Sequence, residues 1–355
     1  FFTSIFCFDL NWSAITSTIN VNDVMVGYNK VYATTDGGIL SFDLFNEQFS
    51  FIGFNEGLYP LDLKSISESS TGHLIVGSSI NGTIQKINLI DKSIDKVDHL
   101  DWVKSINKIS CVDDFVFVVS ETQNSFGIIE YNIIDDELVY IDYYDNFPLV
   151  YNIINDLDIF NDELVISTDN GILYADYKAS LHSSYNWRIE NEGENIIEFE
   201  NGLIVDNNTN IIDLFYDDAT MTYNAISDKF FYEIIGADTT FLMNASVESN
   251  FTSIYRKNNI VVIGLENSGI CLLDRFSGSV NIYIPNSIHT NEISALSFSE
   301  NSLLTGVGRD GFFKIENGII ENYISEDKRS EYPASISNFV NTFISYAPGA
   351  RLSWS

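Results

Sequence analysis

Short apolar runs alternate with polar turns along this chain, a pattern typical of β-strands rather than helices. One unit occurs seven times, with an apolar strand, a short polar turn that usually contains Gly, and a second strand that often ends on Asp or Asn. The seven segments are KVYATTDGGILSFD, HLIVGSSINGTIQKIN, FVFVVSETQNSFGIIEYN, ELVISTDNGILYAD, GLIVDNNTNIIDLFY, NIVVIGLENSGICLLD and SLLTGVGRDGFFKIE. Reuse of one unit predicts a repeat architecture.

The turn glycines of these units recur at a nearly constant spacing. The steps are 44, 45, 44, 98 and 42 residues between Gly38, Gly82, Gly127, Gly171, Gly269 and Gly311. The step of 98 residues spans two repeats, and Asn210 takes the place of the missing glycine because Asn also tolerates a left-handed backbone. The stretch DKFFYEIIGADTTFLMNASVESN is then interpreted as an insertion in or after the fifth repeat.

Each repeat has a further strand on either side. The preceding strands are NVNDVMVG, LKSISES, INKISCV, INDLDIF, NIIEFE, FTSIYR and EISALSFS, and strands such as FSFIGF and SVNIYI follow. Turn pairs such as Asn81-Gly82 favour tight antiparallel hairpins. A β-sandwich would not repeat one unit at this spacing, whereas four strands per period of about 44 residues match a propeller blade. The sequence predicts an all-β fold, a seven-bladed β-propeller with four-stranded antiparallel blades.

The two ends of the chain differ from the repeats. Residues 1–10 begin with FFTSIFCF and are interpreted as a signal-peptide remnant, which implies export, or as an edge strand. Residues 11–325 are predicted to form the propeller as one domain. Residues 326–355 are interpreted as closing strands of the ring or as the start of a truncated further blade, and these alternatives stay open.

Charge narrows the set of partners. Acidic side chains outnumber basic ones by 50 to 18, for a formal net charge of -32. Such a surface repels the phosphates of nucleic acids and anionic lipids, and no run approaches the roughly 18 apolar residues that span a bilayer. We expect neither a nucleic-acid partner nor direct membrane insertion, while the surplus acid aids solubility or attracts a cationic partner or Ca²⁺.

Catalytic and metal-binding motifs are not found. The four histidines form no HExxH or HxH pattern, the three cysteines no CxxC, and GxSxG, GxGxxG and P-loop motifs are absent. Paired carboxylates such as Asp113-Asp114 lie at hairpin turns, where Asp is favoured for backbone reasons. The strands that precede each repeat carry few carboxylates or histidines for a central channel. We therefore predict no catalytic residue, no metal and no cofactor.

Three side chains are candidate ligand contacts. Trp102 and Trp187 lie near blade edges, where an indole could stack on a sugar or a peptide, although packing between blades explains them equally well. Arg309 is a rare cation on an acidic body and could pair with a ligand carboxylate or with a neighbouring one. A protein or glycan partner on one face of the propeller is the expected ligand class.

The segments VYATTDGGILSFD, GLYPLDLKSISESSTGHLIVGSSINGTIQKIN and ELVISTDNGILYAD resemble the two-component-regulator propeller repeat, over roughly residues 20–325. The chain resembles in particular the amino-terminal propeller of PorZ-type proteins associated with type IX secretion. The Trp usual in the central strand of that repeat is replaced, as by Ile75.

That resemblance implies a non-enzymatic, exported binding or scaffold module at the cell envelope, periplasmic, on the outer-membrane surface or extracellular. The alternative is the periplasmic sensing propeller of a hybrid two-component regulator. A propeller hydrolase or lyase ranks third, because it requires carboxylates or histidines that converge on the channel.

Overall fold

The computed structural model describes residues 14–235, 238–244, 249–298, 304–308 and 311–324. The chain divides into two compact units, which are described separately. The first contains the described residues up to 285 except 15–17, and the second contains 15–17 and 286–324. The interpretations of residues 1–10 and 326–355 concern segments outside the described residues.

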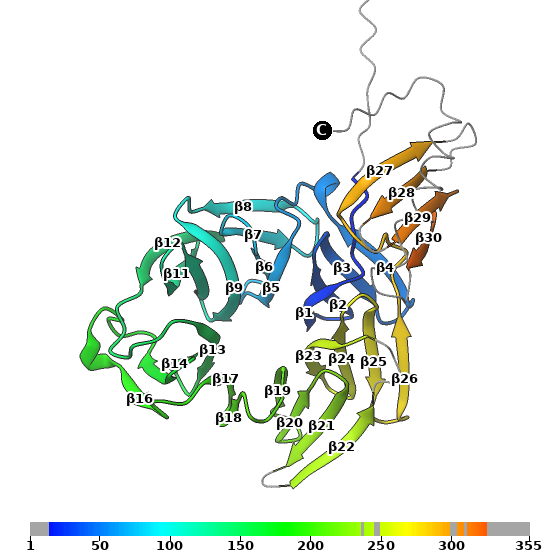
Figure 1. Cartoon of the computed structure of the whole chain (residues 1–355). Coiled ribbons are helices and arrows are strands. Elements are labelled where there is room, and N and C mark those ends of the chain that lie inside the picture. Colours follow the sequence, from blue (N-terminus) through cyan, green and yellow to red (C-terminus); the bar gives the residue numbers. More distant parts are fainter. Residues whose placement is uncertain (1–13, 236–237, 245–248, 299–303, 309–310, 325–355) are drawn as a thin grey trace, which may run out of the picture. The chain divides into compact units, whose positions relative to one another are not determined.

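The first unit consists of antiparallel sheets whose strands follow one another in chain order (Figure 1). Six of the sheets described in this unit have four strands and one has two. The first three are β1 (Val21–Val26), β2 (Lys30–Thr35), β3 (Gly38–Asp43), β4 (Gln48–Ile52); β5 (Leu63–Glu68), β6 (His73–Ser78), β7 (Thr83–Asn88), β8 (Ile94–His99); and β9 (Val103–Val112), β10 (Phe115–Thr122), β11 (Phe126–Ile134), β12 (Glu137–Tyr144).

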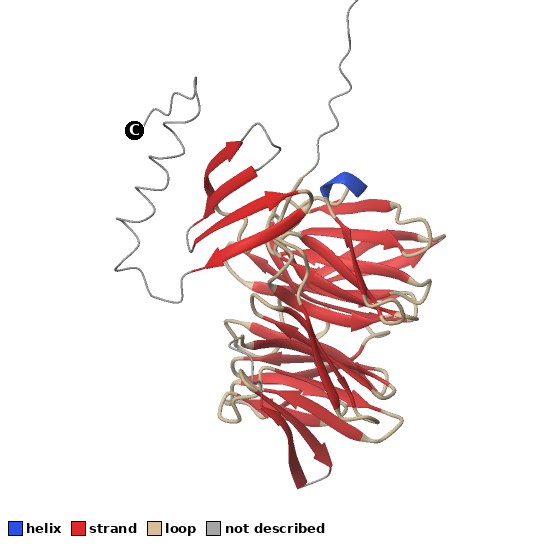
Figure 2. Ribbon diagram, turned by 90° about the vertical axis from the view of Figure 1, so that its right-hand side faces the viewer, coloured by secondary structure: helices blue, strands red, loops and turns tan. Residues whose placement is uncertain are grey.

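The remaining sheets complete the unit. They are β13 (Ile154–Phe160), β14 (Glu163–Thr168), β15 (Gly171–Asp176), β16 (Arg188–Glu190); β17 (Ile196–Glu200), β18 (Leu203–Asp206); β19 (Asp213–Asp217), β20 (Thr222–Ile226), β21 (Phe230–Ile235), β22 (Asp238–Asn244); and β23 (Phe251–Lys257), β24 (Ile260–Leu265), β25 (Gly269–Asp274), β26 (Ser279–Tyr283). Two short 3-10 turns, η1 (Phe54–Glu56) and η2 (Ser184–Asn186), are the helical elements of the described part. Figure 2, in which strands are red, shows that strands and loops dominate the described chain.

Apolar packing joins these sheets into a ring. Seven clusters of buried apolar side chains each contain residues from two neighbouring sheets. One of them packs Val262 and Ile270 of the last sheet against Val24, Ala33 and Phe42 of the first. Each fully buried side chain of this kind contributes about 1.5–3 kcal/mol. The first strand of each sheet, from β1 to β23, lies innermost, and β1 contacts both β5 and β23, so the ring closes.

The second unit is a four-stranded antiparallel sheet of β27 (Ile293–Phe298), β28 (Leu304–Gly308), β29 (Gly311–Glu316) and β30 (Ile319–Ile324). His289 is 9% exposed and lies 3.3 Å, Nδ1 to Oδ1, from Asn322 of β30. This side chain connects the segment before β27 with the outer strand β30.

The predicted all-β propeller fold is confirmed, but the predicted count of seven four-stranded blades is not. The fifth predicted repeat, GLIVDNNTNIIDLFY, is divided, because its first part forms β18 and its second part begins β19 of the next sheet. The stretch taken as an insertion supplies β21 and β22. The seventh predicted repeat forms β28 and β29 in the second unit.

Turn chemistry explains this error. Asn210 has the predicted left-handed backbone, with a φ of 56°. It lies in the connection between two sheets, however, and not in a hairpin. Asn81 and Gly82, with φ of 61° and 52°, form a turn inside a sheet as predicted. The same residue type thus marks both kinds of connection, which the spacing alone does not separate.

Candidate functional site in the central channel

The innermost strands share a backbone irregularity. The pairing register shifts between Val21 and Asp23 in β1, and the corresponding shifts in other inner strands immediately precede Ser65, Lys108, Asp156, Glu198 and Ser253. A bulge of this kind re-aims the side chains that follow it. In β19, Asp213 pairs with Ile226 and takes the equivalent place at the start of the strand. We call these seven residues, one per inner strand, the channel ring.

Two cavities meet at the channel ring. The larger, about 550 Å³, is lined by residues from all seven inner strands of the first unit. The smaller, about 210 Å³, is lined by the bulge residues that precede the ring. Both cavities share Asp23, Lys108, Asp156, Glu198 and Asp213. The ring therefore lies between them, and all inner strands run from the smaller cavity toward the larger one.

Part of the ring joins one sheet to the next. Oδ2 of Asp23 accepts a hydrogen bond from the backbone N–H of Ile66 at 3.0 Å, and Oδ2 of Asp213 accepts one from Ile254 at 2.6 Å. Oγ of Ser65 accepts from the N–H of Ile109 at 3.1 Å. In each case the partner lies on the next inner strand, so these side chains act as latches between sheets.

The other charged members of the ring make no such latch to a backbone N–H. Nζ of Lys108 lies 3.3 Å from Oδ1 of Asp156, which is 5% exposed. Attraction to Asp156 raises the pKa of Lys108 well above its usual value, so the lysine is charged at neutral pH. Desolvation raises the pKa of Glu198 well above its ordinary value, and the neighbouring Asp213 adds to this effect. Desolvation also raises the pKa of Asp213 to about 6.

A second pair of carboxyls lies two residues further along β13 and β17, in the larger cavity. Desolvation raises the pKa of Asp158 to about 7, with a contribution from the charge of Asp156. Desolvation likewise raises the pKa of Glu200 well above its usual range. Oε1 of Glu200 accepts the N–H of Tyr216 at 2.7 Å, whereas Oε2 is buried without a hydrogen-bond partner. The channel is thus a confined, proton-binding, acidic space.

The sequence interpretation underestimated this channel. Five of its carboxyls were present in the strands taken as innermost, namely Asp23, Asp156, Asp158, Glu198 and Glu200. The expectation that these strands carry few such groups was wrong. The usable signal was the polar residue that recurs at one position in strands otherwise rich in Ile and Leu. Asp213 was missed because its strand was assigned to the fifth repeat.

Trp102 and Trp187, two of the three predicted ligand contacts, do not line this channel. Trp187 is 8% exposed, its Nε1–H donates to the carbonyl of Leu181 at 2.8 Å, and Phe147 packs edge-on against it. Trp102 is 41% exposed and contacts the ring of Tyr143 at 4.7 Å between centroids. Arg309 lies outside the described residues. Of the two tryptophans, Trp102 has a ring that is partly exposed to a ligand. Its role as a ligand contact stays a prediction.

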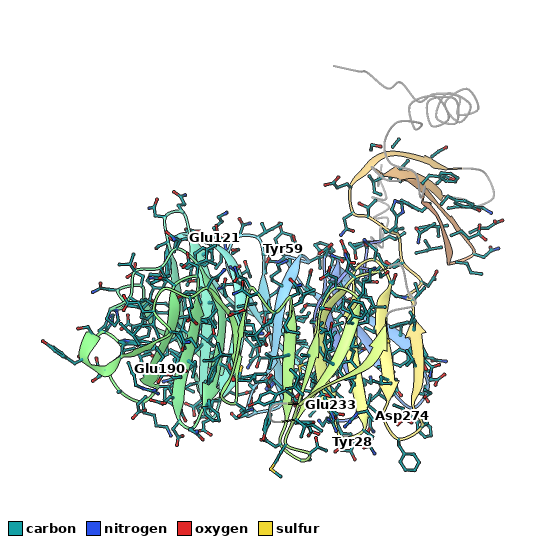
Figure 3. The ribbon with its side chains drawn as sticks, turned by 60° about the horizontal axis from the view of Figure 1, so that its bottom comes forward. Tyr28, Tyr59, Glu121, Glu190, Glu233 and Asp274 are labelled. Carbon is teal, nitrogen blue, oxygen red and sulfur yellow. The ribbon has the colours of Figure 1, made fainter. Side chains whose placement is uncertain are left out.

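Exposed apolar side chains lie on the loops after the first or third strand of several sheets. We call the side of the ring that carries these loops the turn face; Tyr28 and Asp274 lie on it, and Tyr59 and Glu121 lie at the opposite edge (Figure 3). Its apolar side chains are 73–97% exposed, namely Tyr28, Phe45, Ile90, Tyr185, Met221 and Phe276. Tyr28 and Phe45 line a groove of about 320 Å³ together with Lys257.

The described residues contain neither a metal-binding cluster nor a membrane-spanning helix. Among these residues, no group of three or more His, Cys, Asp or Glu side chains has an arrangement that could hold a metal ion. No helix in this part of the chain combines the length and apolar character needed to cross a bilayer. The channel carboxyls are therefore spread around a ring and not gathered at one point.

Comparison with known proteins places the fold. No family model matches the sequence, and no curated protein matches it. PorZ, a surface component of the type-IX secretion system of Porphyromonas gingivalis, matches 88% of this chain and 46% of its own, with a TM-score of 0.59 and 11% identity. The predicted similarity to PorZ is thus confirmed at the level of the fold.

Two other solved structures match with lower scores. The extracellular domain of BT4673 from B. thetaiotaomicron, described as a hybrid two component system, matches 87% of this chain and 40% of its own, with a TM-score of 0.42 and 15% identity. A streptogramin B lyase matches 88% and 96%, with a TM-score of 0.44 and 11% identity. This chain spans less than half the length of PorZ and BT4673. Identities this low show the fold and leave function to the sites.

Proposed function

We propose that this chain is an exported, non-enzymatic binding propeller, associated with type IX secretion, that acts as a scaffold at the cell envelope or surface. The similarity to PorZ supports the compartment. The observation that carries the binding role is the groove on the turn face that is lined by the nearly fully exposed Tyr28 and Phe45. Soluble proteins rarely leave such side chains grouped without a partner.

The geometry of the turn face suits a macromolecular partner. The closed ring holds the loops in fixed positions, and binding residues are commonly placed on such loops. Each buried aromatic covers about 150–250 Å² and is typical of binding hot spots. The net charge of -32 favours a partner with basic groups around its contact surface and disfavours nucleic acid. A protein with a basic rim, or a glycan that stacks on Tyr28 and Phe45, fits these conditions.

Capture from envelope extracts tests this proposal. The purified chain is compared with a Tyr28→Ser, Phe45→Ser, Phe276→Ser variant and with a Val150→Ser control. Val150 is 84% exposed but lies in the β12–β13 connection on the other side of the ring. We expect the triple variant to lose captured partner about tenfold or more, since 1.4 kcal/mol corresponds to a tenfold change, and the control to retain it. Equal capture by all three proteins would contradict the proposal.

A channel enzyme is the second candidate, favoured by the carboxyls that line the larger cavity. Glu198 and Asp213, from neighbouring inner strands, both have raised pKa values, and the value of about 6 for Asp213 suits proton transfer near neutral pH. A panel of glycoside, lactone and ester substrates tests this activity. Turnover by the purified chain that is lost in Glu198→Gln would favour a hydrolase or lyase over the binding role.

A further inference from the structure

We propose that the central channel binds a flexible organic cation with two or more ammonium groups, at the ring formed by Asp156, Glu198 and Asp213. This site differs from the turn face, so the inference goes beyond the proposed function. The ligand class is a linear aliphatic polyamine, and a lysine-rich peptide segment shares its chemistry.

The first support is the charge of the channel. Eight carboxyls line the two cavities, against the charged amine of Lys108 at the ring and Lys64, which lines the smaller cavity; the eight are Asp23, Glu68, Asp113, Asp156, Asp158, Glu198, Glu200 and Asp213. Low-dielectric walls strengthen the field of ionised carboxyls that are held close together. A multivalent cation stabilises the ionised form of carboxyls whose pKa values are raised, such as Glu198, and two lysines do not cancel eight carboxyls.

The second support is a set of buried polar atoms without hydrogen bonds. Oγ of Ser253 has no hydrogen-bond partner although the residue is only 3% exposed, and it lines the smaller cavity. Oδ1 of Asp156 lies within ion-pair distance of Lys108 but accepts no hydrogen bond. A buried polar atom left unpaired costs about 1–3 kcal/mol. An ammonium group offers three donors and can satisfy such acceptors.

The spacing of these groups favours an amine over a metal ion. In the described part of the chain no three acidic, His or Cys side chains converge as metal ligands do. The carboxyls instead come from separate inner strands around the ring. A flexible chain with several ammonium groups reaches carboxylates that one ion cannot contact together. The larger cavity also presents Met25, Phe215 and Tyr255, on which methylene spacers pack and to which cations are attracted.

The structural role of the ring does not account for all of its members. Asp23 and Asp213 are latches, as their hydrogen bonds to Ile66 and Ile254 show. Asp156 makes no such bond, and Glu198 meets Asp213 in a carboxyl pair that hydrogen-bonds. A cavity of about 550 Å³ lies within the size range of small-molecule sites. The latches hold the channel open, whereas Asp156 and Glu198 contact the ring side chains Lys108 and Asp213 and not the backbone, so a ligand can replace those contacts.

Calorimetric titration with spermidine tests the inference. We expect saturable 1:1 binding, weakened at least tenfold in Glu198→Gln. Because the whole surface is acidic, Asp135→Asn is the matched control; this exposed turn residue removes the same charge outside the channel. Asp156→Asn serves as a second channel variant if Glu198→Gln does not fold, and thermal melts of all variants check folding. The neutral 1,5-pentanediol is expected to give no binding.

Further titrations distinguish a free polyamine from a lysine-rich peptide as the ligand. They also define the results that would contradict the inference. A tri-lysine peptide that binds more tightly than spermidine, with the same dependence on Glu198, would identify a peptide segment as the ligand. No saturable heat, or equal weakening in the channel variant and in Asp135→Asn, would overturn the inference. Ca²⁺ binding with channel dependence, in place of amine binding, would overturn it as well. Capture through the turn face is expected to stay unchanged in Glu198→Gln, so the two proposals fail separately.

Discussion

Replacement of Asp158 by Asn is expected to stabilise the ring above neutral pH. Desolvation raises the pKa of this carboxyl from its ordinary 3.8 to about 7. A raised carboxyl pKa means that the folded chain binds a proton more tightly than the unfolded chain. Its contribution to stability is therefore greatest at acidic pH and falls as the pH rises from about 4 to 7. Asn keeps the shape of the side chain and removes the ionisation.

The size of this change in stability follows from the shift in the pKa of Asp158. Linkage between the two pKa values, at 1.36 kcal/mol per pKa unit, gives a loss of about 2–3 kcal/mol for the wild-type chain between pH 5 and pH 8. Asp158 retains some contact with solvent, so screening reduces this to about 1–3 kcal/mol. The groups around it are Asp156 on its own strand, Lys108 on β9 and Glu200 on β17. Asp156 repels the ionised carboxylate of Asp158, and Lys108 attracts it.

Urea unfolding at pH 5, 6.5 and 8 measures the effect. We expect Asp158→Asn to gain about 1–3 kcal/mol over the wild type at pH 8 and to show a flatter dependence on pH. Asp135→Asn is again the control, since it lowers the net charge equally from an exposed turn. If Asp158→Asn and Asp135→Asn have parallel profiles, the pH dependence belongs to the overall charge and not to the channel, and the reasoning is refuted.

Two further predictions concern stability within the ring. Trp187→Phe is expected to cost about 1–3 kcal/mol, because the buried carbonyl of Leu181 loses its donor, whereas Trp102→Phe at a 41% exposed site is expected to change stability by less than about 1 kcal/mol. Arg256→Met is expected to cost about 3–5 kcal/mol, because Arg256 is 3% exposed and pairs with a buried carboxylate. Arg188→Met removes an exposed pair and is expected to cost at most about 1 kcal/mol. Urea unfolding at pH 7 measures all four, and equal losses within either pair would contradict the assigned burial.

The repeat pattern was sufficient to predict the fold because strand length, turn chemistry and spacing repeat together. Segments such as HLIVGSS and its partner strand form β6 and β7 of a four-stranded sheet, as predicted. The prediction failed where a repeat is shortened. β17 and β18 form a sheet without outer strands, so the next repeat starts earlier than the spacing implies. A period alone does not reveal which strand begins a sheet.

The candidate site was harder to predict, since it depends on contacts between repeats. Asp156 and Glu198 each look like one acid in a short apolar strand, and only ring closure places them beside Lys108. For Trp187 the sequence left ligand stacking and blade packing open, and the structure buries its indole against Leu181 and Phe147. Asp113 and Asp114 are adjacent in sequence at a turn, and Asp113 also lines the larger cavity. The acids on the inner strands come together only in space.

The shared bulge connects the two roles of the channel. Every inner strand must hold its neighbour, and a short polar side chain after the bulge does so by accepting an N–H from the next strand, as Asp23 and Ser65 do. This requirement places a polar residue at one level in each sheet, whatever the protein binds. Where the latch is not made, as at Asp156, the position still faces the channel, and its Oδ1 has an ion pair with Lys108 but no hydrogen bond. The positions that connect neighbouring sheets thereby also supply hydrogen-bond acceptors for a ligand. A change from Ser to Asp or Lys at one of these positions alters the charge of the channel without altering the blades.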